Sequence, residues 1–387
     1  MLFLWEINNY NMEISSPAII KRINYIDQLR AWNVLLMCYT HALDSMLADE
    51  FKGTLFFKII SYIEGIVAPS FLFVSGAAFA IVLHKRKESY LVYGKPAQKQ
   101  LLRLLFLLLI AYCLNLPYKT WNQCQTMLTY DQFIMFIRSN NLHVIVFGIF
   151  LSQILFLVIR EEKKFHYTVL TLAGIVVLAT PFIYQYDFAQ IFPLHIATYF
   201  NIKYLSGFPI FHWIAYYFTG CFIMYQLICA IQENREEKLI KKLLLFSIIT
   251  AFIFIMLEVM NIPTSYYYDF WITSPNIFFL RLASVLFIVF MFWLIETKYN
   301  YRMRVFNVFK SESLLVYVLH LMMIYGSVLG PGIEKFFGKT LSWVEIIGIG
   351  TIVASSLLSI AYMWNWFKRE LKLYSRNPLN QHLHQHP

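Results

Sequence analysis

Residues 209–262 read PIFHWIAYYFTGCFIMYQLICAIQENREEKLIKKLLLFSIITAFIFIMLEVMNI, and this stretch decides the fold class. It holds two apolar runs, 209–232 and 243–262, on either side of a charged connection. Each run supplies the roughly 20 apolar residues that a helix needs to cross the hydrocarbon core of a bilayer. Alternation of apolar and polar residues is absent, so the pattern predicts two transmembrane helices rather than strands.

Similar apolar runs recur along the 387 residues, of which 59% are hydrophobic and 14% are charged. Both values lie outside the range of soluble globular domains. The runs long enough to span a bilayer are 29–48, 59–83, 101–118, 142–159, 165–184, 209–232, 243–262, 276–296, 313–330 and 342–366. The sequence therefore predicts an all-α, polytopic membrane bundle of about ten transmembrane helices. One transmembrane domain would occupy residues 27–367, between two tails, 1–26 and 368–387.

The net charge of +10 is distributed unevenly among the connections. About three quarters of the 32 Lys and Arg lie near the ends of the chain or in every second connection, and the other connections hold at most two each. Because short basic loops stay in the cytoplasm, this alternation predicts that both termini are cytoplasmic and that the protein lies in the inner (plasma) membrane. The lipid bilayer, rather than a nucleic acid, is the expected partner of these charges. The five cysteines show no paired spacing, so we expect neither disulfides nor a metal site.

The first span, INYIDQLRAWNVLLMCYTHALDSML (23–47), is more polar than a helix surrounded by lipid would be. At 100° per residue, Arg30 and His41 lie about 20° from the same face and about 16 Å apart along the axis. The other members of this stripe, within about 60° of the same line, are Asp27, Asn33, Met37 and Asp44. Ionisable residues inside a span are costly and usually face a bundle interior or a functional cavity. The alternative is that Arg30 reaches the cytoplasmic interface and His41 only bonds a neighbouring helix.

His41 has the properties of a general base, since its ordinary pKa is near 6.5 and a carboxylate, Asp44, follows one turn later. We expect the Asp44 carboxylate to fix the imidazole tautomer and to stabilise the imidazolium, although an i, i+3 pair need not touch.

Four polar residues inside spans are expected to support this site, namely Asn33 on the first span itself and Glu64, Arg281 and His320 on other spans. Arg281 is expected to pair with a carboxylate, Glu258 or Glu64. His320 is expected to be a packed, hydrogen-bonded histidine rather than a catalyst. Pro69 is expected to kink the second span.

The segment RINYIDQLRA, with His41 eleven residues after Arg30, resembles the opening signature of the transmembrane acyltransferase superfamily. That grouping includes acyltransferase-3 proteins and heparan-alpha-glucosaminide N-acetyltransferase catalytic-domain proteins. The second span, IVAPSFLFVSGAAFAI, is more similar to the latter group. Weaker cues in the expected order are KQLLRLLFLLLIAYCLNLP, LHVIVFGIFLS, FPIFHWIAYYFTGC and LLVYVLHLMM, and together the segments cover about residues 21–330.

Such proteins transfer an acyl group, often acetyl from acetyl-CoA, to a sugar hydroxyl or amine on or across the membrane. The resemblance implies that His41 is the catalytic histidine and that Arg30 is its partner at the acyl-donor end. The chain departs from the pattern at Ala31, where the superfamily usually has Gly. The heparan branch takes its histidine from the loop after the first span, and residues 48–58 contain none, so the role of His41 rests on the acyltransferase-3 side.

The sequence is thus interpreted as an acyl-CoA-dependent membrane acyltransferase with acetyl-CoA or another acyl-CoA as co-substrate and no bound cofactor. Donor phosphates would bind a basic rim of Arg30, Lys99 and Arg103. His41 would deprotonate a hydroxyl or amine of a glycan or lipid-linked acceptor for direct attack on the thioester, with an acyl-histidine intermediate as the alternative route. The runner-up is a secondary transporter or flippase of a polar or lipid-linked solute, and the third option is a membrane scaffold. A homo-oligomer is compatible with the sequence.

Overall fold

The computed structural model describes residues 23–92, 94–116, 129–265, 267–299, 309, 311–327 and 330–376. The regular secondary structure in this part of the chain is helical apart from one two-stranded hairpin and one isolated bridge. The predicted all-α class is confirmed.

Ten stretches correspond to the predicted spans, and the second of them consists of two helices. They are α2 Asn24–Met46, α3 Leu55–Glu64 with α4 Val67–Leu91, α5 Lys95–Leu114, α7 Asn141–Ile159, α8 Glu162–Ile183, α10 Ile210–Gln232, α11 Glu236–Val259, α12 Pro275–Tyr299, α14 Ser313–Tyr325 and α16 Trp343–Arg376. Among the described residues, eight of these stretches are long and apolar enough to cross a membrane. The two others are α2, which carries the polar stripe, and α14, which has 13 residues.

Shorter elements lie in the connections. They are η2 Asp49–Phe51, α6 Tyr130–Ile137, η4 Phe188–Gln190, α9 Leu194–Ala197, η5 Ile202–Tyr204, the strands β1 Gly326–Ser327 and β2 Gly330–Pro331, and α15 Glu334–Phe337. The two strands pair antiparallel directly after α14.

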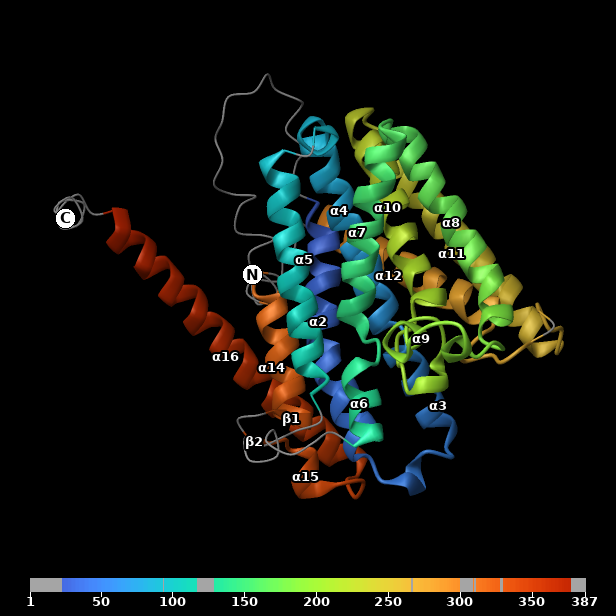
Figure 1. The fold of residues 1–387 in the computed structure, drawn as a ribbon, viewed down its shortest axis with the longest axis vertical. Coiled ribbons are helices and arrows are strands. Elements are labelled where there is room, and N and C mark those ends of the chain that lie inside the picture. Colours follow the sequence, from blue (N-terminus) through green and yellow to red (C-terminus); the bar gives the residue numbers. More distant parts are fainter. Residues whose placement is uncertain are drawn as a thin grey trace.

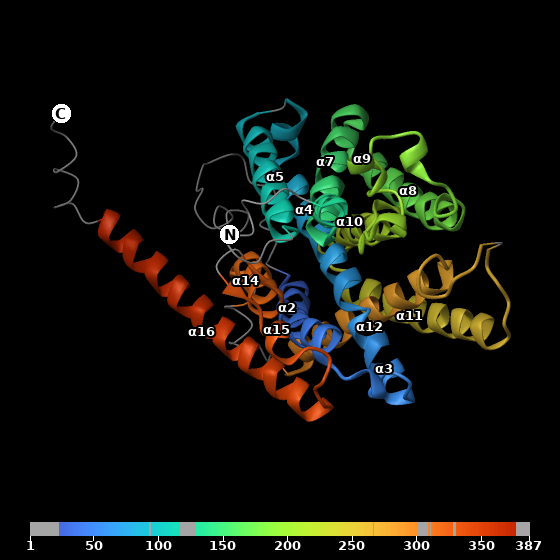
Figure 2. The same cartoon turned by 60° about the horizontal axis from the view of Figure 1, so that its bottom comes forward.

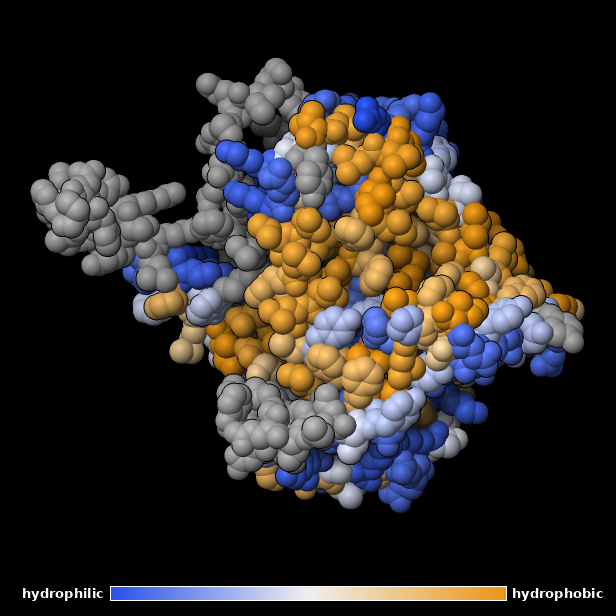
Figure 3. Space-filling view, viewed as in Figure 1, coloured by the Kyte–Doolittle hydropathy of each residue, from blue (hydrophilic) through white to orange (hydrophobic). Residues whose placement is uncertain are grey.

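The long helices form one bundle with α2 inside it, packed against α4, α12, α14 and α16 (Figure 1). Figure 2 shows α11 and α12 together on one side of the bundle and α16 leaning away from it on the other. An apolar band crosses the middle of the molecule and hydrophilic residues gather at both ends (Figure 3). A band of this kind suits the hydrocarbon core of a bilayer, so the chain is a multi-pass membrane protein.

Helices α4 and α10 pack closely against each other through two glycines. A Cβ on Gly76 would lie 1.9 Å from the Tyr217 carbonyl oxygen, and a Cβ on Gly220 would lie 2.0 Å from that of Phe73. Small residues allow this backbone contact between membrane helices. All four cysteines in the described residues are free thiols, and Cys124 lies outside that part of the chain.

Several predicted boundaries need correction. The second span is interrupted at Gly65 and Ile66 rather than kinked at Pro69. Pro69 lies in the first turn of α4. A proline is tolerated there because backbone N–H groups in the first turn of a helix have no acceptor within the helix. The ninth span ends at Tyr325 instead of residue 330, because Gly326 takes a φ of 90°. Helix α2 begins at Asn24 and α16 continues to Arg376, and the division into one transmembrane domain and two tails stays a prediction.

The connections alternate between the two ends of the bundle, as predicted. Those between α4 and α5, α7 and α8, and α10 and α11 lie at the top of Figure 1, whereas α6, α9 and α15 lie towards the bottom.

The excess of Lys and Arg in the connections between α4 and α5, α7 and α8, and α10 and α11 predicts that this end of the bundle faces the cytoplasm. Reporter fusions after Arg160 and after Asn234 should report a cytoplasmic location, and fusions after Lys52 and after Asp187 the opposite side. A single inverted result among these four would overturn the predicted orientation or the helix count.

Candidate active site

The polar stripe of the first span faces the interior of the bundle along most of its length. Arg30, Asn33 and Met37 are buried, His41 is half-buried, and Asp44 near the end of α2 is exposed. Burial of this face confirms that α2 does not lie against lipid alone. The ion pair between Arg30 and Asp27, at 2.9 Å, lies at the first turns of the same helix.

His41 meets two aromatic side chains of α14. Its Nδ1 lies 3.0 Å from the Tyr325 hydroxyl, and the two rings meet edge to face. The His320 ring lies 5.1 Å from the His41 ring, centroid to centroid. His320 is fully buried, with its Nδ1 3.0 Å from the Val316 carbonyl oxygen. His320 is therefore the packed, hydrogen-bonded histidine that the sequence predicts, and it is also a direct neighbour of His41.

The contact with Tyr325 bears on the protonation of His41. If Nδ1–H donates to the Tyr325 oxygen, the lone pair of the neutral imidazole lies on Nε2. Nε2 is then free to accept a proton from a substrate, which is the arrangement a general base needs.

Asp44 does not hold the tautomer of His41, contrary to the prediction. The carboxylate is exposed, and in the described residues it makes no hydrogen bond to His41, whose Nδ1 contacts Tyr325 instead. Residues at i and i+3 share a face of a helix, but a partner from another helix can occupy the position between them.

Charged groups surround the Tyr325 hydroxyl at a greater distance. Asp44, Glu64 and Arg138 all lie within electrostatic range of it. Arg138 follows α6 in the connection to α7, where burial lowers the pKa of its guanidinium from the ordinary value. An arginine keeps its charge at neutral pH even so.

The end of α2 that carries His41 is fixed to the start of α16. The Ala48 N–H donates to the Leu341 carbonyl at 3.0 Å, and the Leu341 N–H donates to the Met46 carbonyl at 3.0 Å. An apolar cluster packs around this junction, made of Ala42, Leu43, Met46, Leu47, Leu341 and Ile346. His41 therefore lies on a rigid helix end, as a positioned base should.

The predicted donor-binding residues lie on two different helices. Arg30 is on α2, whereas Lys99 is exposed and Arg103 is half-buried on α5. A common phosphate site formed by these three residues stays a prediction.

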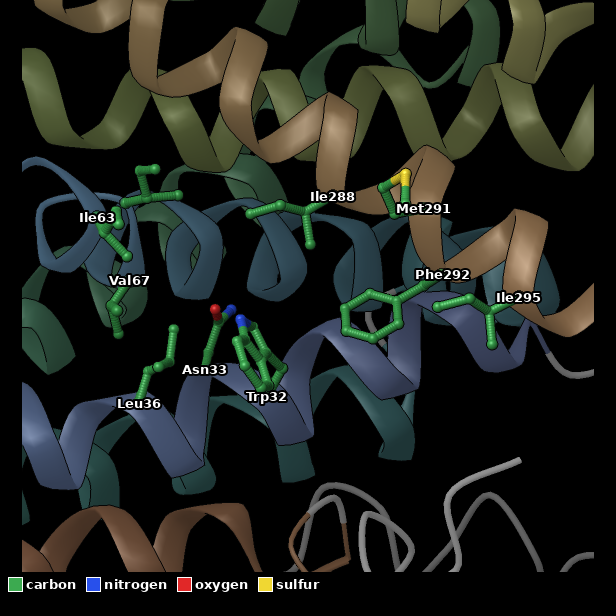
Figure 4. A pocket seen from close by; sticks show the side chains of 10 residues that line it. Trp32, Asn33, Leu36, Ile63, Val67, Ile288, Met291, Phe292 and Ile295 are labelled. Carbon is green, nitrogen blue, oxygen red and sulfur yellow. The ribbon is translucent and has the colours of Figure 1, made fainter. Parts of the chain in front are cut away.

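A cavity of about 420 Å³ lies beside the polar stripe, between α2, the α3–α4 junction and α12 (Figure 4). Trp32 and Asn33 point into it from α2, and the rest of its lining is aliphatic or aromatic apart from the Met291 thioether. Asn33 is buried at the wall of this cavity, and its supporting role stays a prediction.

Arg281 does not pair with the carboxylates predicted for it. Glu258 instead accepts hydrogen bonds from the Tyr268 hydroxyl and the Asn276 amide. In the described residues no carboxylate lies within ion-pair distance of Arg281, whose guanidinium lies 5.8 Å from the centre of the Trp213 ring.

The sequence is similar to one family of known proteins. The model for heparan-alpha-glucosaminide N-acetyltransferase, catalytic, matches residues 22–254, which is more than half of the chain. The chain belongs to that family. No curated protein is detectably similar to it in sequence. The family suggests a membrane N-acetyltransferase, and acyltransferase activity follows from it. The matched region contains Arg30 and His41 but not α14, which supplies both aromatic neighbours of His41.

Sequence reasoning missed Tyr325 and Arg138 in this family member. Tyr325 lies five residues after His320, about 140° away around a helix, so helical periodicity does not place the two on one face. Arg138 lies in a connection between helices. The sequence of such a connection does not show which distant helix its residues approach.

We expect Tyr325→Phe to lower the rate of transfer by about tenfold, the value of one neutral hydrogen bond. The phenylalanine keeps the edge-to-face contact but lets the imidazole exchange tautomers. Steady-state kinetics with the variant should show the loss in kcat, with the KM for acyl-CoA unchanged. An unaltered kcat would show that Tyr325 does not position His41.

Proposed function

We propose that the protein transfers an acyl group, with acetyl as the expected one, from acyl-CoA to a hydroxyl or amine of a glycan or lipid-linked acceptor. The observation that carries the proposal is the Nδ1 of His41 next to the Tyr325 hydroxyl, in a chain of the N-acetyltransferase family. We further propose that the protein lies in the plasma membrane with both termini in the cytoplasm.

His41 would act as the general base. Its Nε2 takes the proton of the acceptor O–H or N–H while that oxygen or nitrogen attacks the thioester carbonyl carbon. The tetrahedral intermediate then collapses, the C–S bond breaks, and the CoA thiolate takes the proton from the imidazolium. Tyr325 is a positioning residue in this scheme, because it acts on His41 and not on the substrate.

Arg30 would bind donor phosphate from the first turns of α2. The Arg30 guanidinium contacts Asp27 through Nη2, and an arginine carries five N–H donors in a planar fork that matches phosphate oxygens. Lys99 and Arg103 would add positive charge from α5. The pantetheine arm would then follow the polar stripe towards His41.

An acyl-CoA turnover assay tests this function. The purified full chain in lipid nanodiscs, given acetyl-CoA labelled in the acetyl group and glucosamine or a lipid-linked sugar as acceptor, should release free CoA thiol and label the acceptor. No CoA release and no CoA binding with any acceptor would remove the enzyme assignment and favour the transporter alternative.

A further inference from the structure

A second cluster of buried polar side chains lies away from His41, where α10, α12 and the end of α3 meet. It consists of Arg281, His212 and Tyr216, which are 7%, 2% and 0% exposed. Among the described residues, the Nε of Arg281 and both ring nitrogens of His212 have no hydrogen-bond partner, and the Tyr216 hydroxyl interacts with the Arg281 guanidinium. Buried polar atoms usually have partners, so several unsatisfied ones in one place indicate a missing ligand.

The side chains of this cluster lie close enough to share one ligand. The His212 and Tyr216 rings are 5.9 Å apart, and the Tyr216 phenol is an electrostatic neighbour of Arg281. Gly65 leaves room for the guanidinium, because a Cβ there would lie 3.0 Å from Nη2 of Arg281. His212 has a φ of 76° at the start of α10, in the left-handed region that a side chain seldom adopts, and this conformation places its ring among the buried residues.

The chemistry of the cluster selects an anion. A guanidinium N–H, a phenol O–H and an imidazole N–H can all donate to an oxyanion. In the described residues Arg281 has no carboxylate partner, and an arginine charge without compensation inside a membrane protein is costly. A ligand that brings a negative charge would remove that cost.

An apolar groove leads to this cluster. The cavity beside Asn33 adjoins a second one of about 400 Å³, because Ile66 and Ile288 line both. The second cavity is bordered by α11 and α12, and it is apolar except for Ser247 and Ser284. Ser284, hydrogen-bonded to Tyr62 at 2.9 Å, lies three residues after Arg281, which is about 4.5 Å along the helix axis. The groove therefore ends about one helical turn from the unpaired cation.

We infer that the groove and the cluster together bind one anionic membrane lipid, with its phosphate at Arg281, His212 and Tyr216 and one acyl chain along α12. The apolar groove would hold the acyl chain of the lipid, and the polar cluster would bind its phosphate. Asn33 borders the groove and also belongs to the polar stripe, but the cluster that would bind the phosphate has no part in the proposed acyl transfer, so either proposal can fail without the other.

Thermal unfolding of the delipidated full chain in detergent tests the inference. Tryptophan fluorescence would follow the Tm while dioctanoyl phosphatidic acid, dioctanoylglycerol or sodium phosphate is added. A ligand of the folded state raises Tm with its concentration. Phosphatidic acid should raise the Tm, whereas the diglyceride, which lacks phosphate, and inorganic phosphate, which lacks chains, should not at equal concentration.

Two variants separate the parts of the site. Arg281→Gln should weaken phosphatidic acid binding at least about tenfold, the loss expected for a hydrogen bond to a charged group. Arg160→Gln, which removes an exposed arginine at the opposite end of the bundle, should bind as the unmodified chain does. If Arg281→Gln does not fold, Ala251→Phe fills the second cavity without touching the cation and should also abolish the Tm rise.

Three results would overturn the inference. An equal Tm rise with the diglyceride would mean that no phosphate is recognised. An equal rise with inorganic phosphate would make the cluster a site for a soluble anion. Unchanged phosphatidic acid binding in both Arg281→Gln and Ala251→Phe would place the lipid elsewhere.

Discussion

His41→Gln should abolish acyl transfer, with a loss of about 10²- to 10⁴-fold in kcat, the usual contribution of a general base. Glutamine has a similar reach and can still hydrogen-bond to Tyr325, so the end of α2 should keep its structure. An amide cannot take the proton of the acceptor at neutral pH. The loss should therefore appear in kcat, while the dissociation constant for acyl-CoA, measured by titration calorimetry, stays nearly unchanged.

A matched control is available on α8. His166 is fully buried like His320, and in the part of the chain that the structure describes neither of its ring nitrogens has a hydrogen-bond partner. His166→Gln makes the same chemical change away from the proposed site, so it should retain activity. If His41→Gln kept most of its activity, His41 would be a structural histidine and the proposed mechanism would be wrong.

The polar stripe on α2 was predictable because its members belong to one helix, whose geometry fixes the angle between any two of them. Burial of Arg30, Asn33 and Met37 confirms that reasoning. Tyr325 was not predictable in the same way. Its contact with His41 depends on how α14 packs against α2 and on the end of α14 before Gly326.

The partner of Arg281 was predicted wrongly for a related reason. Sequence gives the depth of a residue in a span but not the direction in which neighbouring helices face. Glu258 is at a suitable depth, yet Tyr268 and Asn276 already occupy its carboxylate. Arg281 faces Trp213 and the Gly65 turn instead, where the chain brings aromatic rings and no acid within ion-pair distance among the described residues.

Arg30→Ala should raise the KM for acyl-CoA by about 10- to 100-fold, because hydrogen bonds to a charged group contribute about 1.5–3 kcal/mol. The change should leave kcat nearly intact, since Arg30 lies about 16 Å from His41 along α2. Arg30→Lys keeps the charge but loses the planar fork, so it should restore binding only in part. Titration with CoA alone would report the same weakening without turnover.

The ion pair with Asp27 supplies the control that decides what Arg30 does. Arg30→Ala alone leaves the mostly buried Asp27 carboxylate without this cation, and the resulting local distortion would also raise KM. The double variant Arg30→Ala with Asp27→Asn removes both charges and with them the unbalanced carboxylate. If Arg30 binds donor phosphate, thermal stability should recover in the double variant while the KM stays high. Recovery of KM together with stability would show that Arg30 only neutralises Asp27, and the donor phosphates would then have to bind elsewhere.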